Sequence, residues 1–324
     1  MNSEVLSRLK NAGLLSEQVE DLGFVSTGSY ALNKIISGEY GKGIPIGMIT
    51  QFHGEASTAK TVFATHILKE AQAKGYYTML VDSENAYNSR FAEHLGIDPQ
   101  KLIYAAPETL EDCFQVIEDT IKAIRETDTE TPIVVAYDSI AVSPSKAEYE
   151  AESYEGNNMQ GAVRAKATGN CLKKINPLMR KHKVALVVIN QIRNKVGVMY
   201  GNPETMAAGG KSLEYYLGVN LKTLSNKTSD LIKDDHKRVI GIQGTVRNTK
   251  NKVSIPFRET EFKLIYNEGL DAYSGMLEQL VADDIIKKAG AWYTFEENKF
   301  QKKTFYEEFL TDTFKGLREK LGLA

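Results

Sequence analysis

The stretch MITQFHGEASTAKTVFATHILKEAQAKGYYTMLVD, residues 48–82, sets the fold class of this chain. It opens with the strand-like run MITQF, passes through a glycine-containing loop into a helical pattern that stops at Gly75, and closes with the apolar run YYTMLVD. A strand, a helix and a second strand in this order form a βαβ unit with parallel strands. The chain should therefore contain a parallel sheet covered by helices.

Two later apolar runs extend this pattern. IVVAYD from Ile133 and VALVVIN from Val184 are rich in β-branched residues, and each follows a charged helical segment. This alternation predicts an α/β fold with a mainly parallel, twisted sheet flanked by helices. After Gly209, shorter strands predict a partly antiparallel extension of the sheet; they are VNLKTL, RVIGIQGTVRNT and a run from Lys252 to Phe257.

Both ends of the chain differ from this core. The first residues predict a short amphipathic helix, and from Asn267 onward two amphipathic helices flank the segment AGAWYTF. The predicted helices carry Met276 to Ile286 and Phe305 to Leu321. We therefore expect a short N-terminal helical arm at residues 1–24, a core at 25–267 and a small α+β C-terminal domain at 268–324.

The loop GEASTAKT almost fits the P-loop pattern G-x-x-x-x-G-K-S/T, in which backbone N–H groups and a helix N-terminus surround phosphate oxygens. Lys60 would reach the β- and γ-phosphates, and Thr61 would offer its hydroxyl to Mg²⁺. Ala59 stands where the pattern has glycine and adds a Cβ beside the nucleotide. A strand-turn-helix without a ligand would also fit this segment. The candidate nucleotide-binding residues are Gly54, Glu55, Ala56, Ser57, Thr58, Ala59, Lys60, Thr61 and Val62.

Two carboxylates follow apolar strands. Asp138 ends IVVAYD, and Glu84 comes two residues after the strand that ends at Asp82. The carboxyl ends of parallel strands form the edge at which open α/β sheets bind ligands. Asp138 could hold the Mg²⁺ shell through water, and Glu84 could orient or deprotonate an attacking water. Both acids could instead cap the helices that follow them.

Charge and targeting signals limit the class of function. The formal net charge is −2, which argues against binding nucleic acid by bulk charge, so any DNA site should be local. An acidic run containing Glu148, Glu150, Glu152 and Glu155 precedes a basic segment that starts at Arg164. The N-terminus lacks the apolar run of a signal peptide, and no stretch reaches the length of a membrane span. We expect a cytoplasmic protein without a membrane partner.

The connection from Ile192 to about Gly210 is long for a segment without regular structure, which is typical of functional or disordered loops. Within it, Arg193 and Lys195 could meet phosphates, while Met199 and Tyr200 could stack on bases regardless of their sequence. A surface loop with an apolar patch for a protein partner remains the alternative.

Motifs along the whole core resemble those of RecA-type recombinases from bacteria and phages, which identifies a RecA-like P-loop NTPase core. They are STGSYALNKIISG at Ser26, GEASTAKT at Gly54, VDSENA at Val81, YDSIAVSPSKAE at Tyr137, INQIRNKVGVMYGNPET at Ile189, GGKSLEYY at Gly209, KNKVSIPF at Lys250 and KKAGAWYTF at Lys287.

The resemblance implies ATP and Mg²⁺ as cofactors, with Lys60, Glu84 and Gln191 in catalysis and Thr61 and Asp138 at the metal. It places Phe91 beside the adenine. It also implies that Lys250 and Lys252 reach the nucleotide of a neighbouring protomer. The implied DNA-binding residues lie in a first loop from Tyr154 to Gly161, in the second loop and on a later strand: Met159, Arg164, Arg193, Lys195, Gly197, Val198, Met199, Tyr200, Gly201, Asn202, Gly209, Gly210 and Arg247.

The implied function is ATP-dependent homologous recombination: a head-to-tail filament on single-stranded DNA that pairs it with homologous double-stranded DNA. Partners of the family include a single-strand-binding protein and a recombination mediator. The short arm before Val25, the basic C-terminus and Ala59 depart from cellular members and favour a phage origin. The alternatives are a DNA-binding filament or accessory protein with an impaired ATPase, motivated by Ala59, and a hexameric helicase, against which INQIR and GVMYGNPET argue.

Overall fold

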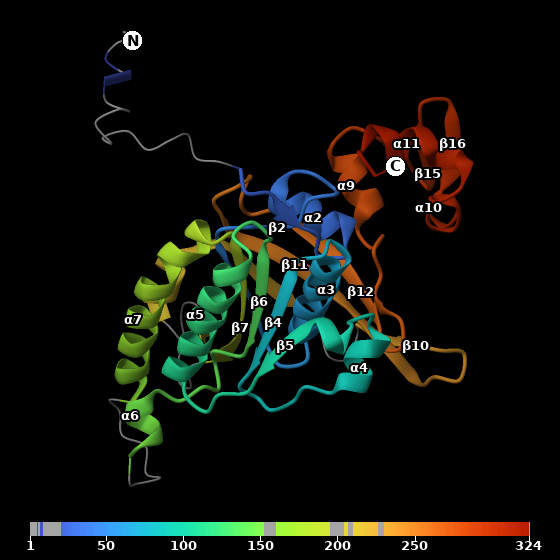
Figure 1. Cartoon of the computed structure of the whole chain (residues 1–324). Coiled ribbons are helices and arrows are strands. Elements are labelled where there is room, and N and C mark those ends of the chain that lie inside the picture. Colours follow the sequence, from blue (N-terminus) through green and yellow to red (C-terminus); the bar gives the residue numbers. More distant parts are fainter. Residues whose placement is uncertain are drawn as a thin grey trace.

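The computed structural model describes residues 21–151, 160–194, 204–206, 210–225 and 230–323, together with Val5, Ser7 and Arg8. A twisted sheet runs through the centre of the core (Figure 1). Its strands, in spatial order, are β13 (Gly269–Leu270), β12 (Glu259–Ile265), β11 (Val239–Asn251), β9 (Leu217–Leu224), β3 (Ile49–Gly54), β7 (Val184–Asn194), β6 (Ile133–Asp138), β4 (Tyr77–Asp82) and β5 (Leu102–Ala105). The strands from β9 to β5 are parallel, and those from β9 to β13 pair in antiparallel fashion, as the sequence predicts.

Helices cover both faces of the parallel part (Figure 1). One layer contains α2 (Tyr30–Ser37), α3 (Lys60–Ala73) and α4 (Ser89–His94), and the other contains α5 (Leu110–Thr127) and α7 (Gln160–Lys181). The strands β3 and β6 are buried along their whole length, which explains why the sequence of β6, IVVAYD, is a nearly continuous apolar run instead of an alternating one. The βαβ unit predicted for residues 48–82 is confirmed, because β3, α3 and β4 follow one another there.

Helix α5 illustrates how local sequence builds these layers. The hydroxyl of Thr109 caps its first turn by accepting the backbone N–H of Asp112. Apolar residues at intervals of three or four, including Leu110, Ile117 and Ile121, are completely buried against the sheet. Burial of each such side chain contributes about 2 kcal/mol. The same pattern on α3 buries Phe63 against the opposite face, so both helices are held by packing.

The predicted strand from Lys252 to Phe257 is wrong. Strand β11 ends at Asn251, whose side-chain oxygen accepts the backbone N–H groups of Val253 and Ser254 and turns the chain. Pro256 lacks an N–H for a sheet ladder, and Phe257 has a φ of 64°. The next strand, β12, lies beyond this turn at Glu259–Ile265.

The connection after Ile192 is more regular than predicted. Strand β7 continues to Asn194 and pairs antiparallel with β8 (Glu204–Met206), in the register Ile192↔Met206 and Asn194↔Glu204. Helix α8 (Gly210–Tyr216) then leads directly into β9. The prediction of a connection without regular structure is therefore wrong at both of its ends, because the strand hydrogen bonding extends beyond the apolar run.

The C-terminal segment is mixed α and β, built around a cluster of aromatic side chains. The predicted first helix ends early, at Ala282 in α9 (Met276–Ala282), and the second is divided into α10 (Lys302–Glu308) and α11 (Lys315–Lys320). AGAWYTF contributes to a small antiparallel sheet of β14 (Lys287–Ala289), β15 (Trp292–Phe295) and β16 (Asn298–Gln301). This cluster also contains Ala31 and Tyr40, so the segment packs beside α2 (Figure 1).

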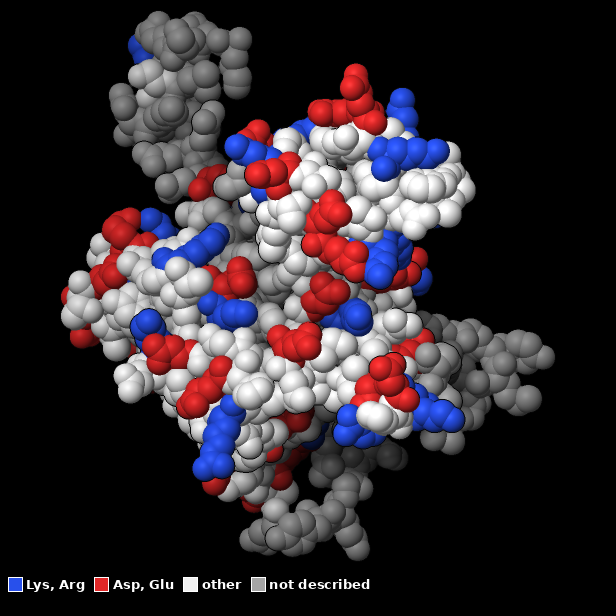
Figure 2. All heavy atoms as spheres, turned by 90° about the vertical axis from the view of Figure 1, so that its right-hand side faces the viewer, with Lys and Arg blue, Asp and Glu red and all other residues white. Residues whose placement is uncertain are grey.

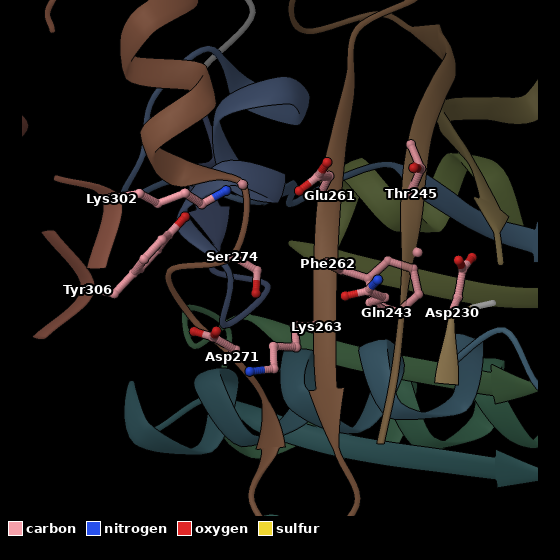
Figure 3. Close-up of a pocket in the computed structure, with 12 residues that line it drawn as sticks. Asp230, Gln243, Thr245, Glu261, Phe262, Lys263, Asp271, Ser274, Lys302 and Tyr306 are labelled. Atoms are coloured by element: carbon pink, nitrogen blue, oxygen red, sulfur yellow. The ribbon is translucent and has the colours of Figure 1, made fainter. Parts of the chain in front are cut away.

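A cleft of about 480 Å³ lies between the C-terminal segment and the antiparallel extension of the sheet. Figure 3 shows Lys302 and Tyr306 entering it from α10, opposite Gln243 and Thr245 on β11. Gly275 also lines the cleft and packs so closely on β12 that a Cβ there would lie 2.3 Å from Thr260 Oγ1.

The remaining short elements of the described residues are β1 (Phe24–Val25), β2 (Ile44–Pro45), α6 (Lys146–Tyr149), β10 (Leu231–Lys233) and two 3₁₀ turns, η1 (Pro99–Lys101) and η2 (Asp312–Phe314). Most of the predicted N-terminal arm lies outside the described residues, so the division of the chain at residues 24 and 267 stays a prediction. Within the described part of the chain, no helix combines the length and the apolar character that crossing a membrane requires.

Candidate nucleotide-binding site

A cavity of about 520 Å³ lies where β3, β4, β6 and β7 end and α3 begins. The structure brings most of the predicted nucleotide residues to it. Its lining comprises Ala56, Ser57, Thr58, Ala59, Lys60, Thr61, Val62, Glu84, Phe91, Asp138, Ile189, Gln191, Ile242, Leu264 and Tyr266. Phe91, on α4, is 45% exposed and offers an aromatic face to a ligand. This edge of the sheet is where parallel α/β folds bind ligands.

The loop from Gly54 to Thr61 is held by its own hydrogen bonds. Lys60 is only 7% exposed, and its ammonium group donates to the backbone carbonyl of Glu55. Thr58 Oγ1 donates to the same carbonyl over 2.9 Å. The lysine charge thus faces the interior of the loop at the N-terminus of α3, where the helix dipole also favours an anion.

Ala59 adopts the left-handed conformation that the P-loop pattern assigns to glycine, with φ 65° and ψ 13°. It is the N-cap of α3 and makes no side-chain capping bond. An L-residue in this region is less stable by about 1–2 kcal/mol, because its Cβ crowds the backbone. Alanine in place of glycine therefore strains the loop, although the backbone at this position keeps the left-handed conformation.

Replacing Ala59 with glycine should stabilise the protein. Glycine relieves the strain of the folded loop but also gives the unfolded chain more conformational entropy, and the first effect is the larger in free energy. The free energy of unfolding should rise by about 0.5–1 kcal/mol and Tm by about 1–3 °C. Thermal unfolding without nucleotide measures the change. Ala64→Gly, inside α3, is the control and should lower stability by about 1 kcal/mol. A loss of stability in both variants would contradict a strained Ala59.

Asp138 and Thr61 meet at the floor of the cavity. Thr61 Oγ1 donates to Asp138 Oδ2 over 2.6 Å, and Asp138 is 8% exposed. Burial raises the pKa of Asp138 to about 6; the hydrogen bond from Thr61 opposes this effect, and the neighbouring Glu84 adds to it. Mg²⁺ usually takes one or two protein oxygens and completes its shell with water and phosphate oxygens. A hydroxyl and a carboxylate at the end of a phosphate-binding loop fit that donor set.

The buried Asp138 should make stability depend on pH. Its pKa in the folded protein lies above the unfolded value, so the native state binds more protons between about pH 4 and pH 6. Stability falls as pH rises through this window, and above it the ionised carboxylate costs about 3 kcal/mol. Asp138→Asn should therefore be more stable than the parent at pH 8, with a smaller gain at pH 5.

Urea unfolding at the two pH values, without metal or nucleotide, measures this difference. Asp119→Asn, an exposed change on α5, controls for the loss of one negative charge. A gain for Asp138→Asn that is equal at pH 5 and pH 8 would disprove the proposed cost of ionisation.

Glu84 is oriented by one side chain that directly follows β6 and by another on β7. Ser139 Oγ donates to Glu84 Oε1 over 2.7 Å, and Gln191 Nε2 donates to the same oxygen over 3.4 Å. Gln191 stands in β7 opposite Gly54 of β3. The carboxylate is thereby fixed between the loop that would hold phosphates and the strand that leads to β8.

Asp82 shapes the loop that carries Glu84. This carboxylate is 3% exposed and accepts the backbone N–H groups of Glu84, Ala86 and Tyr87, at 3.1, 3.3 and 2.9 Å. Tyr104 donates its hydroxyl to the same carboxylate over 3.1 Å. Sequence reasoning used Asp82 only as the end of a strand, although an acid followed by a polar turn is a signal for such a capping role.

A pair of serines fixes β4 against β6. Ser83 Oγ donates to the Ser139 carbonyl over 2.8 Å and accepts the Ser139 N–H over 3.0 Å. The Ser83 N–H donates to the Asp138 carbonyl over 2.9 Å. Because Asp82 and Asp138 are direct partners in the sheet register, this pairing holds the two acidic strand ends level. Sequence reasoning missed Ser139.

The structure does not bring Lys250 and Lys252 to the cavity of their own chain. The ammonium groups of both contact backbone carbonyls at the end of α8, that of Lys250 at Glu214 and that of Lys252 at Tyr215. Burial, with a smaller contribution from Lys252, lowers the pKa of Lys250. Tyr215 beside them is 75% exposed, so the lysines lie next to an open aromatic surface.

Two predicted DNA-binding arginines are paired with acids. Arg164 contacts Glu148 through Nε and Nη2, at 3.0 and 2.9 Å, and Arg247 pairs with Glu259 at 2.8 Å. Glu148 also caps α6 by accepting the N–H and hydroxyl of Ser145. Glu148, from the acidic run that precedes the first loop, thus supplies a helix cap and a partner for Arg164.

The other predicted DNA-binding residues have little structural description. Arg193 lies in β7, but nothing is described of its side chain, and Gly210 begins α8. Those outside the described residues are Met159, Lys195, Gly197, Val198, Met199, Tyr200, Gly201, Asn202 and Gly209. On the face drawn in Figure 2, the described acidic and basic residues are interspersed and form no continuous basic band, which agrees with the low net charge.

Comparisons with known proteins agree with this site. The RecA N-terminal domain family matches residues 10–271. Protein RecA of Ureaplasma parvum is 32% identical over 292 residues, which cover 90% of this chain and 82% of the relative. Protein RecA of Chlorobium chlorochromatii is 34% identical over 275 residues, covering 85% and 73%. For Protein RecA of Clostridium acetobutylicum the identity is 32% over 289 residues, covering 87% and 79%.

The family match spans most of the chain and includes the loop from Gly54 to Thr61, both acidic strand ends and Gln191. The relatives are covered over most of their own length. This chain therefore belongs to the RecA family of nucleotide-binding recombination and repair proteins.

Proposed function

We propose that this protein hydrolyses ATP with Mg²⁺ when bound to single-stranded DNA, and that it forms head-to-tail filaments that carry out homologous pairing and strand exchange. The observation that carries the proposal is the contact of Gln191 Nε2 with Glu84 Oε1 over 3.4 Å. It joins the acid best placed for hydrolysis to β7, the strand that leads to the predicted second DNA loop. A change in the bound nucleotide would therefore be transmitted through Glu84 and Gln191 to the predicted DNA-binding loop.

The roles of the site residues follow from their places. Lys60 and the N-terminus of α3 would neutralise the phosphates, while Thr61 and Asp138 would hold Mg²⁺, which supplies charge neutralisation at the β- and γ-phosphates. Glu84 would orient a water and accept its proton. Ser139 and Gln191 hold the carboxylate for that task, and Phe91 would cover the adenine.

The position of Lys250 and Lys252 supports a shared nucleotide site. They lie outside the cavity of their own chain and beside exposed Tyr215, so they would reach the nucleotide of a neighbouring protomer. Such a contact is heterologous, and a heterologous contact that does not close into a ring propagates as a helix. ATP would then close the subunit interface and couple assembly to hydrolysis.

The test is phosphate release by the purified protein with ATP and Mg²⁺, with and without single-stranded DNA, together with a joint-molecule assay. We expect hydrolysis that depends on DNA, and joint molecules that depend on ATP. Negative-stain images should show open helical filaments. Closed rings with duplex unwinding would indicate a helicase, and DNA binding without phosphate release would indicate an accessory protein.

Glu148→Gln should strengthen binding to single-stranded DNA. It releases Arg164 from its ion pair, while glutamine keeps the oxygen that caps α6. One additional phosphate contact should steepen the slope of log K against log salt by about 0.7 and raise affinity several-fold at low salt. Fluorescence anisotropy across a salt series measures both quantities. Glu150→Gln removes the same charge from the exposed part of the run and serves as the control; equal effects of both variants would contradict a specific release of Arg164.

A further inference from the structure

Thr223 lies beneath the phosphate-binding loop, on a strand that sequence reasoning did not connect with nucleotide binding. It is 1% exposed, near the end of β9, and its partner in the sheet register is Gly54 on β3. A Cβ on Gly54 would lie 2.3 Å from Thr223 Oγ1 and 2.5 Å from the Thr223 carbonyl oxygen. Thr223 therefore occupies the space that a side chain on Gly54 would need, so position 54 accepts only glycine.

The hydroxyl of Thr223 also holds the middle of the loop. Thr223 Oγ1 and Thr58 Oγ1 are 2.7 Å apart, and both atoms are buried. Each hydroxyl has one further acceptor, the His53 carbonyl at 3.3 Å for Thr223 and the Glu55 carbonyl at 2.9 Å for Thr58. Whichever hydroxyl donates to the other, the second can donate to its own carbonyl, so the two stay joined.

Thr58 is the residue of the loop that most needs such a partner. Its neighbours Ser57 and Ala59 both adopt positive φ angles, 63° and 65°. The left-handed conformation is disfavoured for an L-residue because its Cβ crowds the backbone, and a buried hydrogen bond stabilises a loop by a comparable amount. The contact is thus of a size to offset a substantial part of the strain on either side of Thr58.

We infer that Thr223 is a positioning residue for nucleotide binding: through Thr58 it holds the strained phosphate-binding loop in the form that receives phosphates. The inference rests on the proposed nucleotide function of the loop and adds to it a residue on β9. Thr223 itself lies below the loop and lines no part of the cavity.

The test measures the affinity for a fluorescent ADP analogue with Mg²⁺, which avoids hydrolysis. Thr223→Val removes only the hydroxyl and should weaken binding about 3- to 10-fold, the equivalent of one lost hydrogen bond. Thr223→Ser keeps the hydroxyl and should bind like the parent. Thr50→Val is the matched control, because Thr50 on β3 is fully buried and its hydroxyl has no hydrogen-bond partner among the described residues. The affinity of this variant should not change.

A double-mutant cycle with Ala59→Gly tests the link to strain. Glycine relaxes the loop, so Thr223→Val should weaken binding by less than about 3-fold in the Ala59→Gly background. Additive effects, or parent-like binding by Thr223→Val, would overturn the inference while leaving the nucleotide site intact. A parent protein that does not bind ADP at all would overturn the proposed function and the inference together. Thermal unfolding of each variant without nucleotide ensures that affinities are compared on folded protein.

Discussion

Replacing Lys60 with alanine should reduce ATP hydrolysis on the order of 10³-fold. Its ammonium group is almost buried and contacts the Glu55 carbonyl inside the loop, which places the charge where phosphates would enter. Alanine removes the only side-chain cation that lines the described cavity, while the bond from Thr58 to the Glu55 carbonyl remains to hold the loop.

Phosphate release with saturating single-stranded DNA measures this loss. Lys74→Ala, at the C-terminal end of the same helix, removes a lysine whose ammonium group contacts the Phe24 carbonyl, and it should hydrolyse ATP like the parent. If Lys60→Ala retained even a tenth of the parent rate, the loop would not be the catalytic phosphate site.

Glu84→Gln should separate nucleotide binding from hydrolysis. Glutamine keeps an oxygen that can accept from Ser139 and Gln191, so the local structure should be retained, but it cannot accept a proton from water. We expect the rate of phosphate release to fall about 10²- to 10⁴-fold, with little change in the affinity for ADP. Filaments on single-stranded DNA should persist longer, because the ATP that is proposed to close the subunit interface would remain bound.

Single-turnover hydrolysis and ADP titration, carried out on the same preparation, distinguish the two effects. Glu93→Gln, on α4 and exposed, is the matched control. A parallel loss of affinity and rate would show that Glu84 supports the fold of the site instead of the reaction.

Much of this arrangement can be predicted from sequence, because it depends on local patterns. The run from Met48 to Asp82 predicts a strand, a helix and a strand, and apolar runs that end in acids predict which carboxylates share one edge of a parallel sheet. Asp138 and Glu84 then lie beside the loop from Gly54 to Thr61, because the carboxyl ends of parallel strands are all at the same edge of the sheet. The roles of Lys60, Glu84 and the other site residues stay predictions.

Other features depend on contacts between distant residues. No local pattern connects Thr223 with Thr58, which are 165 positions apart, or Ser139 with Glu84, which are 55 apart. The strand predicted after Asn251 does not form, because the side-chain oxygen of Asn251 turns the backbone by accepting two N–H groups. The pattern of apolar residues does not indicate such a bond. The predicted C-terminal helices fail because turns interrupt an otherwise helical spacing of apolar residues. Helix α9 ends in a turn at Asp283 and Asp284, and a short 3₁₀ turn at Asp312–Phe314 separates α10 from α11.

The short pairing of β7 with β8 has a consequence for engineering. Asn194 and Glu204 are direct antiparallel partners, so the segment of residues 195–203 begins and ends at points that the ribbon holds about 4.5–5.5 Å apart. A segment of different length or sequence can be grafted between these two points without altering the stem. Gln191 precedes the residues of β7 that pair with β8 and is in register with Gly54, so it would keep its place at the candidate nucleotide site. The segment predicted to be the second DNA loop could in this way be exchanged while β7 and β8 keep their pairing.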